Sequence, residues 1–256
     1  MKKNRLPLII GAIISAALIV SIFIVIKYKN NQVNVASDEN QPVAEQGKKD
    51  NPTKEQPKTP ENVTEPQEQP DENGYYPNQA MPTEPTYIDG ILLANKKYPL
   101  PSTFAPGENP EARQALNKMI AEAKQQGFNL VAFSGYRSYE YQTTLYNNYV
   151  KRDGQAAADR YSARPGFSEH QTGLAFDIGE VGKEDLWLTE EFGETPAGKW
   201  LFEHAAEYGF ILRFPQNKEH LTGYMYESWH YRYVGIDIAK KIKKQNSTLE
   251  EYLGAQ

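Results

Sequence analysis

The chain has 256 residues, with 28 Lys and Arg against 33 Asp and Glu, and it contains no cysteine. The lack of cysteine excludes disulfides, thiolate metal sites, a cysteine nucleophile and a lipid-modified cysteine. The net charge of −5 provides no basic surplus for contacts with phosphates, so no nucleic-acid partner is expected.

Residues 1–29 are predicted to anchor the chain in a membrane. Three basic residues within the first five precede Leu6–Ile26, a run of 21 residues without a charge. About 20 apolar residues span the hydrocarbon core of a bilayer as a helix. A signal-peptide core has only about 7–15 residues and ends at a small-residue cleavage site, whereas this run continues directly into Lys27. We favour a retained anchor; a cleaved signal peptide is the alternative.

Residues 30–85 are predicted to form a disordered linker. The stretch is rich in Pro, Glu, Gln, Asn and Lys and almost free of large aliphatic side chains. Such a composition cannot bury enough apolar surface to offset the loss of chain entropy on folding. A flexible chain of about 55 residues has an average end-to-end distance of roughly 40 Å. The linker is therefore expected to hold a folded domain, residues 86–256, away from the membrane.

Turn signals and apolar spacing predict the elements of this domain in chain order. The predicted elements are a strand or hairpin at 87–93, a helix from Asn109-Pro110 to Gly127, a strand at 128–133, helices at 139–152 and 155–162, a strand at 174–178, a helix from Thr195-Pro196 to Gly209, strands at 210–214 and 229–234, and a helix at 236–242. Ser247-x-x-Glu250 has the pattern of a capping box and opens a last helix. Helices mixed with short antiparallel strands predict a single α+β domain, with a small sheet flanked by helices.

Two segments carry the residues with the clearest chemistry. His170 and Asp177, in strand-like surroundings, and His230, far downstream, can supply three ligands to a zinc ion and leave a fourth position for water, as catalytic zinc sites do. Glu227, three residues before His230, is placed where a general base would be needed. From the residues alone, two structural histidines are an equal alternative, since spacing does not test whether separate segments meet. Other divalent ions would also bind this set.

Several motifs in this chain resemble those of a known family. Ser168-x-His170-x-x-Gly173-x-Ala175-x-Asp177 and Glu227-x-Trp229-His230 resemble the paired motifs of the VanY-like zinc D-alanyl carboxypeptidases. This family includes D-Ala-D-Ala carboxypeptidases and LdcB-like L,D-carboxypeptidases, which trim peptidoglycan stem peptides. The segments 134–138, 209–213 and 231–235 resemble further motifs of the family, and the likeness extends over about residues 87–239.

The resemblance implies a role for each motif residue. His170, Asp177 and His230 would hold Zn²⁺, which lowers the pKa of a bound water from ~15.7 to ~7. Glu227 would take the proton of that water and pass it to the leaving amine. Arg137 would stabilise the oxyanion, or bind the carbonyl and carboxylate of the substrate.

Ser168 and Gln142 would, by the same resemblance, form hydrogen bonds with the C-terminal end of the substrate. Without the family, Ser168 reads as a turn or helix cap, Gln142 as part of a solvated helix face and Arg137 as a member of a surface ion pair. His204 and His220 lie outside the motifs, and both are expected to be structural or to face solvent.

The expected protein is a monomeric, single-pass membrane protein whose catalytic domain faces the cell wall and releases a terminal D-alanine from peptidoglycan stem peptides. L,D-carboxypeptidase activity on tetrapeptides is favoured, and D,D-activity on pentapeptides is the close alternative. A catalytically silent wall-binding module and an endopeptidase that cuts cross-links are further alternatives.

Overall fold

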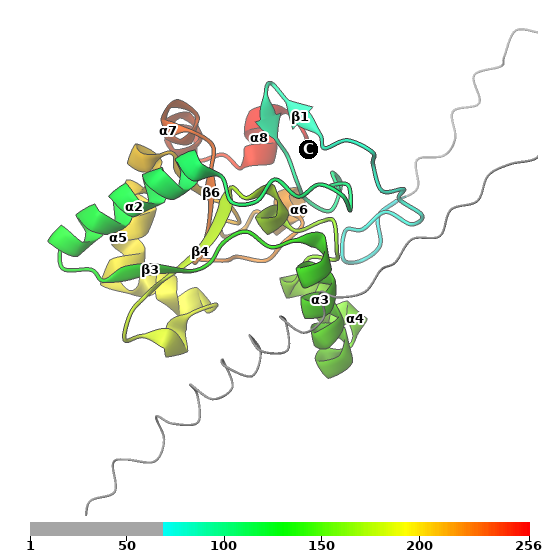
Figure 1. Cartoon of the computed structure of the whole chain (residues 1–256), viewed down its shortest axis with the longest axis horizontal. Coiled ribbons are helices and arrows are strands. Elements are labelled where there is room, and N and C mark those ends of the chain that lie inside the picture. Colours follow the sequence, from blue (N-terminus) through cyan, green and yellow to red (C-terminus); the bar gives the residue numbers. More distant parts are fainter. Residues whose placement is uncertain (1–68) are drawn as a thin grey trace, which may run out of the picture. The chain divides into compact units, whose positions relative to one another are not determined.

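The computed structural model of the protein describes residues 69–256 (Figure 1), so the predicted anchor and most of the predicted linker lie outside the described residues. Within 69–256, no helix is both long and apolar enough to cross a membrane. The strands are β1 (Tyr87–Ile88), β2 (Ile91–Leu92), β3 (Leu130–Ser134), β4 (Ala175–Glu180), β5 (Phe210–Leu212) and β6 (His230–Tyr233). The α-helices are α2 (Pro110–Gln125), α3 (Tyr139–Asp153), α4 (Gln155–Tyr161), α5 (Pro196–His204), α6 (Glu219–Thr222), α7 (Ile236–Gln245) and α8 (Leu249–Leu253). The 3-10 helices are η1 (Glu169–Thr172), η2 (Glu184–Leu186), η3 (Glu190–Glu194) and η4 (Ala205–Tyr208).

A four-stranded antiparallel sheet in the order β3-β4-β6-β5 forms the centre of the fold, and β1 and β2 pair as a separate hairpin. Successive side chains of a strand point to opposite faces of a sheet. Phe176 and Tyr231 therefore lie on the face that forms the main hydrophobic core. Asp177, His230 and Arg232 point to the opposite face, where they are also buried.

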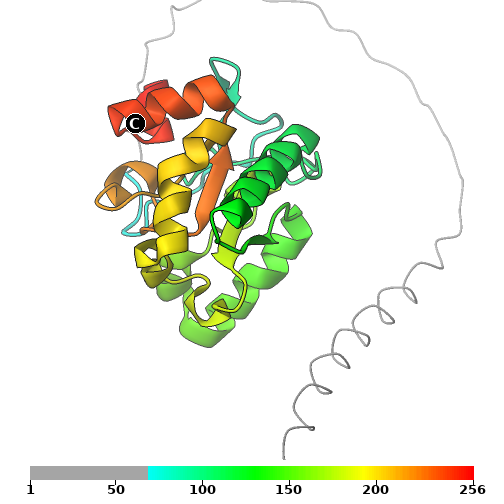
Figure 2. The ribbon, with the colours of Figure 1, turned by 90° about the vertical axis from the view of Figure 1, so that its left-hand side faces the viewer.

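Helices α2 and α5 cover the core face of the sheet (Figure 2). Helix α2 begins where the Asn109 side chain accepts a hydrogen bond from the Ala112 N–H and Pro110 occupies the first turn, both favoured at a helix N-terminus. Leu116 and Met119 recur at helical spacing and are fully buried. Burial of one such side chain contributes about 1.5–3 kcal/mol to stability. The predicted helix is confirmed.

The predicted α+β class is confirmed, but the last helix starts one residue later than predicted. The capping box at Ser247-x-x-Glu250 is wrong, because Thr248 caps α8: its hydroxyl accepts from the Glu251 N–H, and the Glu251 side chain accepts from the Thr248 N–H. Glu250 points into the protein instead, where it forms an ion pair with Arg213.

Residues 71–76 pack onto the domain, although they fall within the stretch 30–85 that was predicted to be linker. Tyr75 is 2% exposed, and its ring meets that of Phe167 edge-on, with 5.1 Å between the ring centroids. The ammonium group of Lys96 lies 4.9 Å from the centroid of the Tyr75 ring. The packed part of the chain therefore begins earlier than predicted, because a buried aromatic ring and a buried cation hold this segment.

Candidate active site

Two of the predicted metal ligands face each other across neighbouring strands. Asp177 in β4 and His230 in β6 are register partners, so their side chains leave the sheet side by side on the same face. Asp177 Oδ1 lies 3.4 Å from His230 Nδ1, and both side chains are buried. The antiparallel pairing of β4 with β6 thus builds half of the predicted site.

His170 comes from η1, not from the strand-like segment that was predicted. This 3-10 helix ends at Gly173, which has a φ of +71°. A Cβ at this position would lie 2.0 Å from the carbonyl oxygen of Gly107, so the turn requires glycine. The turn places His170 Nε2 3.3 Å from Asp177 Oδ1. The ligand atoms of His170, Asp177 and His230 then lie within 4.8 Å of one another.

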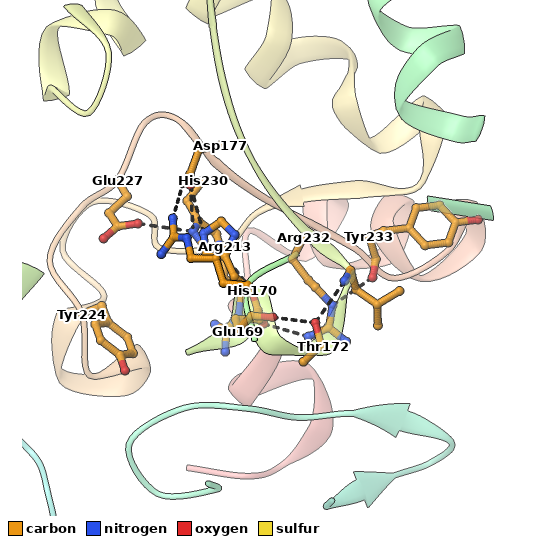
Figure 3. A network of polar contacts seen from close by, with 12 residues as sticks. Glu169, His170, Thr172, Asp177, Arg213, Tyr224, Glu227, His230, Arg232 and Tyr233 are labelled. Atoms are coloured by element: carbon orange, nitrogen blue, oxygen red, sulfur yellow. Dashed lines mark hydrogen bonds and ion pairs between the residues drawn. The ribbon is translucent and has the colours of Figure 1, made fainter. Parts of the chain in front are cut away.

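Each histidine turns one ring nitrogen towards the site and bonds the other to a neighbour. His170 Nδ1 lies 2.8 Å from the carbonyl oxygen of Gly135. A carbonyl only accepts, so Nδ1 carries the proton and Nε2 is left to bind a metal. His230 Nε2 lies 3.1 Å from Glu169 Oε2, and its Nδ1 faces Asp177 (Figure 3). Both side chains are therefore oriented as metal ligands.

The electrostatics of the site favour a bound cation. Among the residues that the structure describes, Asp177 Oδ1 is buried without a hydrogen-bond partner, whereas buried polar atoms nearly always have one. Burial opposes ionisation of Asp177, but the neighbouring His170 and His230 hold its pKa well below the usual value. Burial lowers the pKa of His170, and the charge of Arg137 lowers it further. Burial also opposes protonation of His230, yet the neighbouring carboxylates of Asp177 and Glu169 raise its pKa to about 9. An ionised carboxylate and two imidazoles fit zinc.

Glu227 lies beside the three ligands, as expected for a general base. Its Oε2 is 3.4 Å from His230 Nδ1, and its backbone N–H donates to the carbonyl oxygen of Phe214. Burial is the largest influence on this carboxyl group and raises its pKa to about 7. A group with a pKa near neutrality can both accept and release a proton at neutral pH.

The ligands and Glu227 line a cleft of about 450 Å³, within the size range of small-molecule sites. Helices α3 and α4 form one wall of the cleft, and the segment that leads into β6 forms another. The residues that line these two walls are Leu145, Tyr149, Arg152, Tyr161, Tyr224, Met225 and Trp229. A peptide can therefore reach the metal ligands from solvent.

Arg137 lines the cleft and is bonded to the metal site. Its Nη2 lies 2.7 Å from Asp177 Oδ2 and 3.0 Å from Ser134 Oγ, and its Nη1 lies 3.4 Å from Gln142 Oε1. The guanidinium group is thus within the site, as its expected role requires. It also holds the carboxylate oxygen of Asp177 that does not face the histidines.

The two residues expected to bind the end of the substrate are placed differently. Ser168 is buried in the wall of the cleft, so its contact with substrate stays a prediction. Gln142 lies behind the cleft wall: its Nε2 donates to the carbonyl oxygen of Ala163 at 2.7 Å, and its Oε1 accepts from Arg137. Gln142 therefore positions Arg137 and the loop at Ala163.

Sequence patterns indicated no role in the site for four residues that form a charged cluster beneath His230. Glu169, Arg213, Arg232 and Glu250 each have a side chain that is at most 1% exposed. We call them the buried charge cluster. The available signals were weak: Glu169 adjoins a predicted ligand, and both arginines lie in segments that resemble family motifs. The pairing of these charges depends on contacts between distant segments.

The remaining histidines lie away from the metal ligands, as expected. The ring of His204 stacks on Trp200 with 4.8 Å between centroids, and its Nδ1 faces Glu207. His220 is exposed at the surface. Neither belongs to the group of potential metal ligands found among residues 69–256.

A His–Asp–His set with a buried glutamate beside it, at the bottom of a cleft, defines a metallohydrolase. The family follows from comparison with known proteins. The family model VanY, described as D-alanyl-D-alanine carboxypeptidase, matches residues 107–236, a range that includes every predicted site residue. The protein belongs to the VanY family.

Individual relatives agree with this assignment. YodJ of Bacillus subtilis is 42% identical over 181 residues, which cover 63% of this chain and 66% of YodJ, just under two thirds of that protein. The crystal structure of the L,D-carboxypeptidase DacB from Streptococcus pneumoniae is 52% identical, covers 64% of this chain and 86% of its own, and has a TM-score of 0.58. A mutant of the vancomycin-resistance D,D-pentapeptidase VanY in complex with Zn(II) is 35% identical, covers 63% of this chain and 97% of its own, and has a TM-score of 0.55.

Proposed function

We propose that this protein is a zinc-dependent carboxypeptidase that releases the terminal D-alanine from peptidoglycan stem peptides. The observation that carries the proposal is the Glu227 carboxyl group, buried 3.4 Å from His230 Nδ1 beside a complete three-ligand set. Membership of the VanY family and the Zn(II) complex of a VanY relative support it.

Each of the cleft residues Glu227, Arg137 and Ser168 has a different role in the proposed reaction. Bound zinc supplies a Lewis acid that lowers the pKa of a water molecule to ~7. Glu227 accepts a proton from the water on its carboxylate and delivers it to the nitrogen of the departing D-alanine. Arg137 donates hydrogen bonds to the carbonyl oxygen or the terminal carboxylate of the peptide. Ser168, in the same cleft, offers a hydroxyl to that end of the substrate.

We favour L,D-activity on tetrapeptides over D,D-activity on pentapeptides. The L,D-carboxypeptidase DacB is 52% identical to this chain, whereas the D,D-pentapeptidase VanY is 35% identical. D,D-activity remains the alternative, because the description of the VanY family model is D-alanyl-D-alanine carboxypeptidase. The two activities share the metal, Glu227 and Arg137, and they differ in the shape of the cleft beyond the scissile bond.

Mass spectrometry of defined muropeptides incubated with the full chain tests the proposal. Loss of one alanine from the tetrapeptide alone, prevented by a chelator and by Glu227→Gln, is the expected result. Loss from the pentapeptide alone would move the protein to the D,D-branch. If a folded, zinc-loaded chain left both peptides intact, the carboxypeptidase proposal would be wrong and a wall-binding module would replace it.

An endopeptidase would act on cross-links and not on chain ends. Digestion of intact sacculi separates the two, because cleavage of cross-links converts muropeptide dimers to monomers. We expect the dimers to persist while free alanine accumulates. The three metal ligands and the general base Glu227 are all present and lie next to one another. This argues against a binding module without catalytic activity.

We further propose that the protein is a single-pass membrane protein whose domain faces the cell wall. The uncharged run Leu6–Ile26 and the polar stretch after it support this arrangement, and all of the first and most of the second lie outside the described residues. Fractionation of cells that express the full chain or a chain without residues 1–29 tests it, and only the full chain should sediment with membranes. Light scattering in detergent should give the mass of a monomer after subtraction of the detergent.

A further inference from the structure

The side chains of the buried charge cluster (Glu169, Arg213, Arg232 and Glu250) meet the metal site through a hydrogen bond between Glu169 and His230. Glu169 Oε1 accepts from Arg213 Nε and from Arg232 Nη1, each at 2.7 Å. The other oxygen, Oε2, lies 3.1 Å from His230 Nε2 (Figure 3). One carboxylate thus joins two buried guanidinium groups to one metal ligand.

We infer that Glu169 is a positioning residue that determines which nitrogen of His230 is available to bind zinc. Arginine side chains only donate, so Oε1 is occupied by two donors and Oε2 is left as an acceptor. His230 must then donate from Nε2, so in the neutral imidazole that binds zinc the lone pair is on Nδ1, which faces the site 3.4 Å from Asp177 Oδ1. The tautomer of a ligating histidine is set by the hydrogen bond at its other nitrogen.

The two histidine ligands are oriented by different means. His170 bonds to the carbonyl oxygen of Gly135, a backbone group that no substitution removes. His230 depends on the side chain of Glu169, and that side chain is held in place by the two arginines. The orientation of His230 is therefore a property that mutation can change without touching a ligand.

Substitution of Glu169 by glutamine has a specific expected effect. The amide oxygen would face Arg213 and Arg232, because both are donors and an amide NH₂ there would be repelled. The amide NH₂ would then face His230 Nε2, which would have to accept. The proton of His230 would move to Nδ1, the nitrogen that zinc requires. The size and shape of residue 169 stay the same, so the change affects the tautomer of His230 and one buried charge.

The same cluster provides a matched control. Glu250 binds Arg213 through two hydrogen bonds of 3.0 and 2.6 Å and accepts from Asn95, but it does not contact His230. Glu169→Gln and Glu250→Gln each remove one of the two buried carboxylates that form ion pairs with Arg213. Both are expected to lower stability, and only the first changes the partner of a metal ligand.

Competition between the metal-free full chain and a chromogenic chelator measures the affinity for zinc. We expect Glu169→Gln to raise the zinc Kd by about 10- to 100-fold, the usual effect of losing an outer-shell partner, and Glu250→Gln to change it by less than about 3-fold. Equal Kd values for both variants, whether both are unchanged or both are raised, would refute the inference and leave Glu169 with a purely structural role.

A charge-balanced variant keeps the test decisive if Glu169→Gln does not fold. The double variant Glu169→Gln/Arg232→Gln leaves Arg213 paired with Glu250, so the cluster stays neutral, and it should show the same loss of zinc affinity. Arg232→Gln alone should not show this loss, and an equal loss in this variant would refute the inference. The inference rests on the zinc site of the proposed function, but the measurement uses no peptide. A chain that binds zinc and leaves muropeptides intact would contradict the proposed function alone.

Discussion

Arg137 and Asp177 form an ion pair in which Nη2 lies 2.7 Å from Oδ2. The other oxygen of Asp177 faces the two histidines. Asp177 is therefore divided between a guanidinium group and the metal position, and it can offer the metal only one oxygen without losing Arg137. This links the residue expected to bind substrate to the residue expected to bind zinc.

The pair predicts that Arg137→Lys is not a conservative change. The guanidinium group bonds Asp177 and Ser134 through Nη2 and leaves donors on its other nitrogens. All three donors of a lysine are on one nitrogen, which cannot reproduce this planar arrangement. We expect kcat/KM on the tetrapeptide to fall by about 10²- to 10³-fold, the usual effect of losing an oxyanion donor. Steady-state kinetics with zinc content as a control measures this, and a decrease of less than about 3-fold would rule out the role.

Glu227→Gln should remove activity and, in the metal-free protein, increase stability at neutral pH. Burial raises the pKa of Glu227 from 4.5 to about 7, so folding favours its protonated form. That contribution is fully present below pH 4.5 and is lost as the pH rises through about 7. Glutamine does not titrate, so the stability of the variant does not fall in this way. The free energy of unfolding of the variant minus that of wild type should therefore rise by on the order of 3 kcal/mol between pH 4.5 and pH 8.

Urea unfolding of the two metal-free proteins at pH 5 and pH 8 measures this difference. Catalysis should fall by about 10²- to 10⁴-fold in the zinc-loaded variant, as expected for loss of a general base. A stability difference that does not change with pH would show that the carboxyl group titrates normally.

Removal of the metal should lower both activity and thermal stability, and added Zn²⁺ should restore both. A ligand that binds only the folded state stabilises it by about 2.7 kcal/mol at 100 times its Kd. His230→Ala should abolish this response in a thermal melt. His204→Ala is the matched control, since His204 stacks on Trp200 at a distance from the site. An unchanged zinc response in His230→Ala would remove that residue from the ligand set.

Gly173→Ala should be strongly destabilising because both the backbone conformation and the space at this position disfavour a side chain. Its φ is +71°, and an added Cβ would lie 2.0 Å from the Gly107 oxygen. Gly182→Ala is the control, since Gly182 has a φ of +86° but no atom within 4 Å of the added Cβ. The left-handed conformation alone costs about 1–2 kcal/mol, so Gly173→Ala should cost roughly 2 kcal/mol more than the control. Equal costs in urea unfolding would contradict the clash.

Tyr75→Ala should weaken the domain although Tyr75 lies in a stretch of linker-like composition. The guanidinium carbon of Arg164 lies 3.9 Å from the centroid of the Tyr75 ring, and Phe167 packs on its edge. Loss of a buried aromatic side chain costs about 3–5 kcal/mol. Tyr87→Ala, at a position that is 56% exposed, should cost less than about 1 kcal/mol. Similar costs for both would show that the segment is not part of the folded unit.

Much of the fold was predictable because its signals are local. The helix from Asn109-Pro110 to Gly127 follows from a cap, a proline and apolar spacing, and the strands follow from short apolar runs between glycines. The capping box illustrates the limit, since Ser247-x-x-Glu250 and Thr248-x-x-Glu251 fit the pattern equally well. The structure uses the second, because Glu250 is needed inside the protein as a partner of Arg213.

The candidate site was predictable to the same extent. The residues alone left two structural histidines as an equal alternative, and the three ligands and Glu227 follow from motifs that resemble those of the family. Glu169 and its partners do not, because Arg213 and Arg232 lie 44 and 63 residues away along the chain. Tyr75 was missed for a similar reason: two adjacent tyrosines in a polar stretch carry no periodicity, and distant neighbours bury the Tyr75 ring.

The position of Glu250 within the chain has a consequence for the order in which the site is completed. All three metal ligands have been synthesised once residue 230 is in place, but Glu250 comes 20 residues later, in α8. Until that helix docks, Arg213 lacks the carboxylate that takes two of its hydrogen bonds. A growing chain can therefore hold the full set of ligands before it holds the carboxylate of Glu250 that pairs with Arg213. The electrostatic surroundings of the metal site are among the last parts of the domain to be completed.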